Sequence, residues 1–192
     1  MALMQITEPG AVQSEQSPRK TALGIDLGTT NSIVAYFDGK KTRMLADLEG
    51  RVSLPSIVHY GESGIAVGLE AAKMLSVDPQ NTVASAKRIL GRASAELESD
   101  LNLILTNEEV PAFETAQGRK TSVEVAADIL RTLRDRAESQ ISDTIFGAVI
   151  TVPAYFDDAQ RQATRQAAEL AGLKVLRLLN EPTAAAVAYG LD

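Results

Sequence analysis

Residues 23–32 read LGIDLGTTNS, and this stretch decides how the rest of the chain is organised. An apolar run over residues 22–25 leads into Asp26 and then into a Gly-Thr-Thr-Asn turn. A second apolar run follows over residues 33–37. Two apolar runs joined by so short a turn predict a β-hairpin.

The turn of this hairpin has the residue types of an anion-binding loop. Gly28 lets the backbone approach a ligand closely, and successive N–H groups can form a nest for a phosphate. The hydroxyls of Thr29 and Thr30 add donors. Asp26 ends the first strand beside the turn, where a single carboxylate suits a hydrated Mg2+ that holds a polyphosphate. The alternative is an ordinary hairpin whose Asp and Thr side chains satisfy their own turn.

Composition excludes several classes of site and partner. The 192 residues contain no cysteine, which excludes disulfides, thiolate metal sites and a cysteine nucleophile. His59 is the only histidine, which argues against histidine triads and multi-histidine zinc sites. A net charge of −6 argues against a nucleic-acid partner. No apolar run approaches the roughly 20 residues that span a bilayer, and no secretory signal begins the chain, so we expect a cytoplasmic protein without a membrane partner.

The hairpin belongs to a larger unit that a second, smaller unit interrupts. Residues 1–20 are polar and lack periodicity, so we predict a mobile N-terminal arm. Residues 21–55 and 120–192 are predicted to form the main α/β subdomain. Residues 56–119 are predicted to form a small inserted α+β subdomain.

The inserted subdomain is predicted to contain short strands and helices. His59 alternates with apolar neighbours, so we expect it at a strand surface rather than as a ligand. Lys87 lies in a short helical segment that Gly91 ends. Taken by itself, a Lys-Arg pair indicates a solvated face. The expected elements are strands over 54–60, 65–68 and 103–105, helices over 69–75, 85–92 and 95–101, and a hairpin closed by Gly118.

After the insert, the chain predicts a long helix and then an apolar strand. Residues 121–124 read TSVE, which fits a capping box. Apolar residues then recur at helical spacing to about Gln140. Residues 146–152 form a continuous apolar run ended by Pro153, as in a strand buried on both faces.

The last part of the chain continues the alternation of helices and strands. Asp157 or Asp158 is expected to cap a helix that Gly172 stops. A buried strand over 174–179 and a helix over 183–189 follow. Strands separated by helices imply parallel pairing, so together with the hairpin they predict a mixed sheet flanked by helices.

Three blocks of the sequence, read together, resemble the DnaK-type, seventy-kilodalton heat-shock chaperones. The blocks are GIDLGTTNS at 24–32, VITVPAYFDDAQRQAT at 149–164 and LLNEPTAAAVAYGLD at 178–192. The resemblance covers about residues 21–192. Within the family the chain is most similar to the HscA branch, which is devoted to iron–sulfur cluster assembly. That similarity rests on the short arm MALMQITEPG, the phrase PSIVHY, and Asp157, where general-purpose members usually carry asparagine.

The resemblance implies an actin-like ATPase with ATP and Mg2+ as its ligands. Such a domain has two lobes, each a ribonuclease-H-like fold with an inserted subdomain, and ATP binds in the cleft between them. The chain matches the first lobe only. The second phosphate loop, the adenine pocket and the peptide-binding domain would lie beyond Asp192. We therefore expect a chain truncated at the lobe boundary that binds ATP weakly and hydrolyses it negligibly by itself.

The resemblance also implies roles for individual residues in the nucleotide site. Asp26 and Glu181 would hold the hydrated Mg2+ through water. Lys87 would reach the γ-phosphate and the attacking water, where its charge stabilises the transition state. Glu181 also suits a helix N-terminus as an ordinary acidic residue. The first phosphate loop would comprise Gly28, Thr29, Thr30 and Asn31.

A second set of residues resembles the family's allosteric relay. Pro153 and Arg161 match the pair that passes the nucleotide state to the substrate-binding domain, and Asp158 matches a residue near the interdomain linker. From the sequence alone, Asp158 and Arg161 are an i, i+3 ion pair on one helix, worth about 0.2–0.5 kcal/mol.

The implied partners are a J-type co-chaperone (HscB-like) and an iron–sulfur scaffold protein (IscU-like) bound through the peptide-binding domain. A general protein-folding chaperone of the same family is the alternative. Two rivals come from the same superfamily, namely small-molecule kinases such as the glycerol kinases, and actin-like filament proteins. The PAYFDDAQRQAT block argues against the kinase, and Lys87 in its KRILG context argues against the filament protein.

Overall fold

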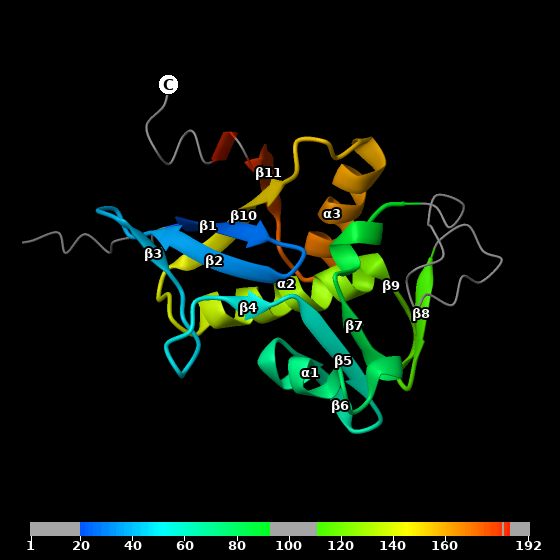
Figure 1. Ribbon diagram of the computed structural model, residues 1–192. Coiled ribbons are helices and arrows are strands. Elements are labelled where there is room, and N and C mark those ends of the chain that lie inside the picture. The colour runs from blue at the N-terminus through cyan, green and yellow to red at the C-terminus, as the bar shows by residue number, and fades with distance from the viewer. Residues whose placement is uncertain (1–19, 93–110, 182, 185–192) are drawn as a thin grey trace, which may run out of the picture.

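The protein is described by a computed structural model that covers residues 20–92, 111–181 and 183–184 (Figure 1). Residues 1–19 of the expected arm and the elements expected over 95–101 and 103–105 lie outside this range. Lys20 is the first residue of a strand rather than part of the arm. The main sheet contains β1 (Lys20–Leu27), β2 (Asn31–Phe37), β3 (Thr42–Met44), β4 (Leu54–Pro55), β10 (Thr144–Val152) and β11 (Val175–Asn180).

The main sheet is mixed, as the connections between its strands require. Its order is β11-β10-β1-β2-β3, and β4 pairs with β2 beside this path. The predicted hairpin is confirmed, because β1 and β2 are antiparallel neighbours joined by a short turn. β1, β10 and β11 are parallel, and α3 (Asp158–Leu170) returns the chain from β10 to β11. The predicted α/β class with a mixed sheet flanked by helices is therefore confirmed.

The core lies between this sheet and the helices α2 (Ser122–Glu138) and α3, which pack on each other (Figure 1). Alternate residues of β10 enter this core, and Ala148 and Ile150 are fully buried. The expectation that residues 146–152 are buried on both faces is wrong, because the intervening Val149 and Thr151 are only half-buried, and Phe146, at the start of the run, is 41% exposed. β11 is only half-buried, because it lies at the edge of the sheet.

Both main helices begin with a complete capping box. The Thr121 side chain accepts from the N–H of Glu124, and the Glu124 carboxylate accepts from the N–H of Thr121 at 2.8 Å. Asp157, rather than Asp158, caps α3, where it accepts from the N–H of Gln160 at 2.8 Å. Reciprocal bonds of this kind satisfy the free N–H groups at a helix start, so the sequence sets both helix starts locally.

The inserted segment forms a second sheet beside the first. This sheet has the antiparallel order β6-β5-β7. The strand expected over 54–60 is divided at Ser56, so that β4 joins the main sheet and β5 joins the smaller one. The division into subdomains stays a prediction. The elements are β5 (Ile57–Gly61), β6 (Gly64–Val67), α1 (Leu69–Met74), β7 (Thr82–Ala84), the 3-10 helices η1 (Pro79–Asn81) and η2 (Ala86–Ile89), and the hairpin of β8 (Ala112–Thr115) and β9 (Gly118–Thr121).

Two polar side chains of β5 face inward and bind to neighbouring segments. His59 is only 9% exposed, which corrects the expectation of a surface residue, and its Nε2 lies 3.0 Å from Asp78 Oδ2. Hydrogen bonding from His59 and Asn81 lowers the pKa of Asp78. The Tyr60 hydroxyl donates to Asp128 of α2 at 2.8 Å, and burial raises the pKa of Tyr60. These bonds join the smaller sheet to its surroundings.

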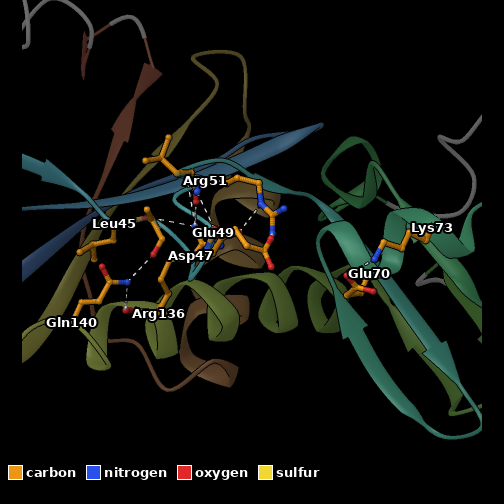
Figure 2. A network of polar contacts seen from close by, with 10 residues as sticks. Leu45, Asp47, Glu49, Arg51, Glu70, Lys73, Arg136 and Gln140 are labelled. Atoms are coloured by element: carbon orange, nitrogen blue, oxygen red, sulfur yellow. Dashed lines mark hydrogen bonds and ion pairs between the residues drawn. The ribbon is translucent and has the colours of Figure 1, made fainter.

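Helix α2 also holds the loop between β3 and β4 of the main sheet (Figure 2). Arg136 Nη1 donates to the carbonyls of Leu45, Arg51 and Val52 at 3.3, 3.4 and 3.2 Å. Gln140 Nε2 donates to the carbonyl of Ala46 at 2.8 Å. Arg51 pairs with Asp47 and Glu49 within the loop. One guanidinium therefore satisfies three carbonyls of a segment that forms little regular structure of its own.

We expect Arg136→Met to destabilise the protein by about 1 kcal/mol, because three carbonyls lose a charged donor and exchange it for water. Urea denaturation gives this value. Hydrogen exchange should also speed up at the amides of Asp47 and Gly50, which close the loop through backbone bonds.

Arg165→Met is the matched control, because Arg165 is exposed on α3 and enters no hydrogen bond or ion pair in the described part of the chain. Equal denaturation midpoints for the two variants would show that Arg136 does not hold the loop.

Candidate nucleotide site

The candidate site lies at the edge of the main sheet where the three parallel strands end. Asp26 is the last residue but one of β1, Pro153 follows β10, and Glu181 follows β11. Parallel strands present their carboxyl ends at one edge, and open α/β sheets bind ligands in the crevice outside that edge. The topology therefore brings together residues that lie up to 155 positions apart in the sequence, from Asp26 to Glu181.

The turn after β1 is too tight for any residue except glycine at its start. A Cβ atom at Gly28 would lie 2.0 Å from the carbonyl oxygen of Asn31. The Gly28 N–H donates to Ser32 Oγ at 3.2 Å, so the protein itself engages one donor of the expected anion nest. Thr29 is half-buried and Thr30 is exposed at the turn. The hydrogen bond to Ser32 thus holds the turn in place, and the two threonines lie at the edge of the sheet.

Asp26 has a fixed side-chain orientation at this edge. Thr151 lies opposite it on β10, and the Thr151 hydroxyl donates to Asp26 Oδ1 at 2.8 Å. The other oxygen, Oδ2, has no hydrogen-bond partner among the residues that the structure describes. Asp26 is exposed, as a residue that faces away from the core should be. Sequence reasoning missed Thr151, whose only signal is a polar residue in the apolar run of residues 149–152.

Lys87 and Glu181 meet at this edge in an ion pair. Lys87 Nζ lies 2.9 Å from Glu181 Oε1, although 94 residues separate them. The Lys87 side chain is only 8% exposed, which corrects the pattern-based view of a solvated Lys-Arg face. Its ammonium also lies 5.7 Å from the centre of the Phe156 ring, within range of a cation–π interaction. A lysine buried this far needs an anion, and Glu181 supplies it.

The backbone around η2 explains how Lys87 reaches the edge of the main sheet. Ser85 precedes η2 with φ 57°, a left-handed conformation that is costly for a residue other than glycine. Gly91 follows it with φ 72°, and a Cβ there would lie 2.6 Å from Gln160 Cα. Gly91 therefore ends the helical segment, as the sequence predicts, and also lets it approach the start of α3.

The three residues expected to form the relay lie in or just after the loop between β10 and α3, with Pro153 at its start and Asp158 and Arg161 on the first turns of α3. Arg161 Nε donates to the carbonyl of Phe156 at 3.0 Å, and Nη2 donates to Asn180 Oδ1 at 2.9 Å. The i, i+3 pair with Asp158 is absent from the ion pairs of the described residues, because the guanidinium points to these two partners instead. The carbonyl of buried Pro153 accepts from the N–H of Phe156 at 3.2 Å. Arg161 thus ties α3 to the residue before Glu181.

The oxygen ligands at this edge fit a hydrated magnesium ion. Asp26 and Glu181 offer carboxylates, and Mg2+ prefers oxygen ligands and retains several waters. In residues 20–92, 111–181 and 183–184, no three His, Asp or Glu side chains lie close enough together to hold a metal ion. Over the same residues, no helix has the length and apolar composition needed to cross a membrane.

Comparisons with known proteins identify relatives over the whole chain. The family model described as Hsp70 protein matches residues 22–192. Proteins named chaperone protein HscA homolog from Acinetobacter baumannii (strain AYE) and Acinetobacter baylyi are each 56% identical to the chain over 194 residues. A protein of the same name from Actinobacillus pleuropneumoniae serotype 5b is 54% identical over 197 residues. The alignments cover 100% of this chain and 31% or 32% of each relative, so the chain spans about a third of the curated relatives.

The Lys87–Glu181 pair predicts an asymmetric response to mutation. Glu181→Gln should destabilise the protein by about 1 kcal/mol, because it leaves a buried ammonium without its anion. Lys87→Met should change stability by less than about 0.5 kcal/mol, since an apolar side chain of similar length fills the same place without a charge. Urea denaturation measures both changes.

Glu169→Gln is the control for the loss of one negative charge, because Glu169 is exposed on α3. If Glu181→Gln is no less stable than this control, the ion pair does not compensate the burial of Lys87.

Proposed function

The chain belongs to the Hsp70 family, and from this membership we propose that it forms the first lobe of the nucleotide-binding domain of an ATP-dependent chaperone. The observation that carries the proposal is the buried Lys87, held by Glu181 at the carboxyl edge of the parallel strands. A structural lysine gains little from such burial, whereas a lysine that must meet a phosphate benefits from a fixed position and a low local dielectric.

The proposed chemistry is hydrolysis of ATP, in which water attacks the γ-phosphorus and the bond to the β-phosphate oxygen breaks. Lys87 would donate to the γ-phosphate and orient the attacking water. The backbone of the turn at residues 28–31 would lie against the phosphates, and Thr29 and Thr30 would add hydroxyl donors. These groups are positioned before ligand binding, so little reorganisation accompanies the reaction.

Asp26 and Glu181 would hold Mg2+ through its water ligands. When bound, Mg2+ would neutralise part of the phosphate charge. The hydrogen bond from Thr151 supports this role, because it fixes one oxygen of Asp26 and leaves the other for a coordinated water. Glu181 would serve both the metal and Lys87, since its side chain is 44% exposed and only one of its oxygens pairs with Nζ.

The relay function proposed for Pro153, Asp158 and Arg161 fits their position beside the site. Arg161 connects α3 to Asn180, and Asn180 is followed directly by Glu181. A movement of Glu181 on nucleotide binding or hydrolysis would therefore reach α3 through one hydrogen bond. Asp158 is exposed on the first turn of α3, where a linker or another domain can contact it.

The proposed cellular role is iron–sulfur cluster assembly in the cytoplasm, based on relatives named HscA homolog. The partners would be a J-type co-chaperone (HscB-like) and an iron–sulfur scaffold protein (IscU-like). Because the chain covers 31% of these relatives, we assign the rest of the nucleotide site and the peptide-binding domain to the part that it does not cover. A general protein-folding role within the same family is the alternative.

Titration calorimetry with ATP·Mg2+ tests the proposal. The 192-residue chain should bind weakly, whereas a longer form extended through the second lobe should bind at least 100-fold more tightly. In the longer form, Lys87→Ala should lower kcat by about 100-fold or more, as for other preorganised transition-state donors.

Lys41→Ala is the control in this experiment, because Lys41 is exposed in the loop between β2 and β3. Tight binding by the 192-residue chain would mean that the first lobe holds a complete nucleotide site. Full turnover by Lys87→Ala would remove Lys87 from the mechanism.

A further inference from the structure

Two buried serines lie directly beneath the turn that follows β1. Ser32, on β2, has no exposed surface, and Ser56, between β4 and β5, is 3% exposed. Their hydroxyl oxygens are 2.9 Å apart. Ser32 Oγ accepts from the Gly28 N–H at 3.2 Å, and Ser56 Oγ donates to the Gly28 carbonyl at 2.8 Å. The two hydroxyls therefore satisfy both backbone polar groups of one glycine.

The directions of these hydrogen bonds follow from the single hydrogen that each hydroxyl carries. Ser56 gives its hydrogen to the Gly28 carbonyl, so its oxygen must accept the hydrogen of Ser32. Ser32 in turn accepts from the Gly28 N–H. The three bonds close a ring in which every donor points the same way round. Hydrogen bonds arranged in one direction polarise and strengthen one another, especially in a buried site.

Ser56 also fixes the turn through its backbone. Its N–H donates to the carbonyl of Thr30 at 2.8 Å. The residue before it, Pro55, pairs with Asn31, the last residue of the turn. Ser56 therefore contacts the first and third residues of the four-residue turn. It lies at the point where the chain leaves the main sheet for the smaller one.

We propose that Ser32 and Ser56 are positioning residues that set the backbone of the phosphate-binding turn, and that Ser56 couples this turn to the inserted segment. The assignment of the turn to phosphate rests on the proposed function. Lys87 belongs to the same inserted segment, so a rotation of that segment would move Ser56 and Lys87 together. The turn and the lysine would then approach or leave the phosphates as one unit.

The ring can be tested without nucleotide by hydrogen exchange at the Gly28 amide in the 192-residue chain. Ser32→Ala removes the acceptor of this N–H and should lower its protection by about tenfold, the effect of losing one buried hydrogen bond. Ser56→Ala leaves the acceptor of the Gly28 N–H in place. It should still lower the protection of this N–H by at least threefold, because it breaks the hydrogen-bonded ring of Gly28, Ser32 and Ser56. The double variant should resemble Ser32→Ala alone rather than the product of the two effects.

Ser53→Ala is the matched control for these variants. Ser53 lies three residues before Ser56 in the same segment, and its hydroxyl enters no hydrogen bond within the described range. If an alanine variant fails to fold, Ser56→Cys replaces it, since a thiol fills the space but donates weakly. If the Gly28 amide is as protected in both Ser56→Ala and Ser56→Cys as in the wild type, the three hydrogen bonds of the ring do not depend on one another.

A kinetic arm separates positioning from a merely structural role. In the longer form, Ser32→Ala and Ser56→Ala should each raise the KM for ATP by about tenfold and change kcat by less than twofold. KM should change more than kcat because the two serines set the backbone of the turn that would bind the phosphates, without contacting the reacting atoms. An unchanged KM, with altered exchange at Gly28, would overturn the positioning role.

The two arms also distinguish failure of this inference from failure of the proposed function. If the wild-type longer form does not bind ATP, the proposed function fails, and the coupling of the turn to phosphates fails with it. The exchange measurements on the 192-residue chain would still decide whether the serine ring holds the turn. Tight ATP binding with no effect of either serine would reject only the inference.

Discussion

Parallel pairing of β1 with β10, and of β10 with β11, is the constraint on which the site depends. β1 pairs with β2 on one side and with β10 on the other, so it lies in the middle of the strand path. The parallel register sets Asp26 opposite Thr151 and ends β11 one residue before Glu181. Once this register forms, the two carboxylates share an edge without any contact between them. A shift of one residue would turn Asp26 toward the core.

The charge of Lys87 restricts where the inserted segment can place this side chain. An ammonium buried to this degree is unstable unless an anion lies beside it, and the carboxyl edge of the sheet provides Glu181. The Phe156 ring adds a surface that tolerates a cation. Phe156 precedes α3 in the chain, and Glu181 follows it. When the inserted segment packs against the main sheet, Lys87 is therefore brought to Glu181 at the same time. A solvated lysine would not need such a partner.

Features set by neighbouring residues could be predicted from the sequence, and features set by distant residues could not. The hairpin around Gly28, the capping box at Thr121 and the cap at Asp157 or Asp158 depend on residues within a few positions. The hairpin and the capping box are confirmed, and the cap is Asp157. The burial of His59 depends on Asp78, and the direction of Arg161 depends on Asn180. No local pattern encodes such partners. Family resemblance selected Lys87 and Glu181, but only the fold could show that the two side chains meet.

Three of the contacts between the described part of the inserted segment and the main unit differ in chemistry. Near the turn, Ser56 makes neutral, directional hydrogen bonds. At the edge of the sheet, Lys87 makes an ion pair whose partner is half-exposed. The buried Tyr60 of β5 donates to Asp128 of α2. A phosphate would compete with Glu181 for Lys87, but it would leave the neutral bonds and the Tyr60 bond in place. Ligand binding would therefore change one of these contacts and leave the segment attached through the other two.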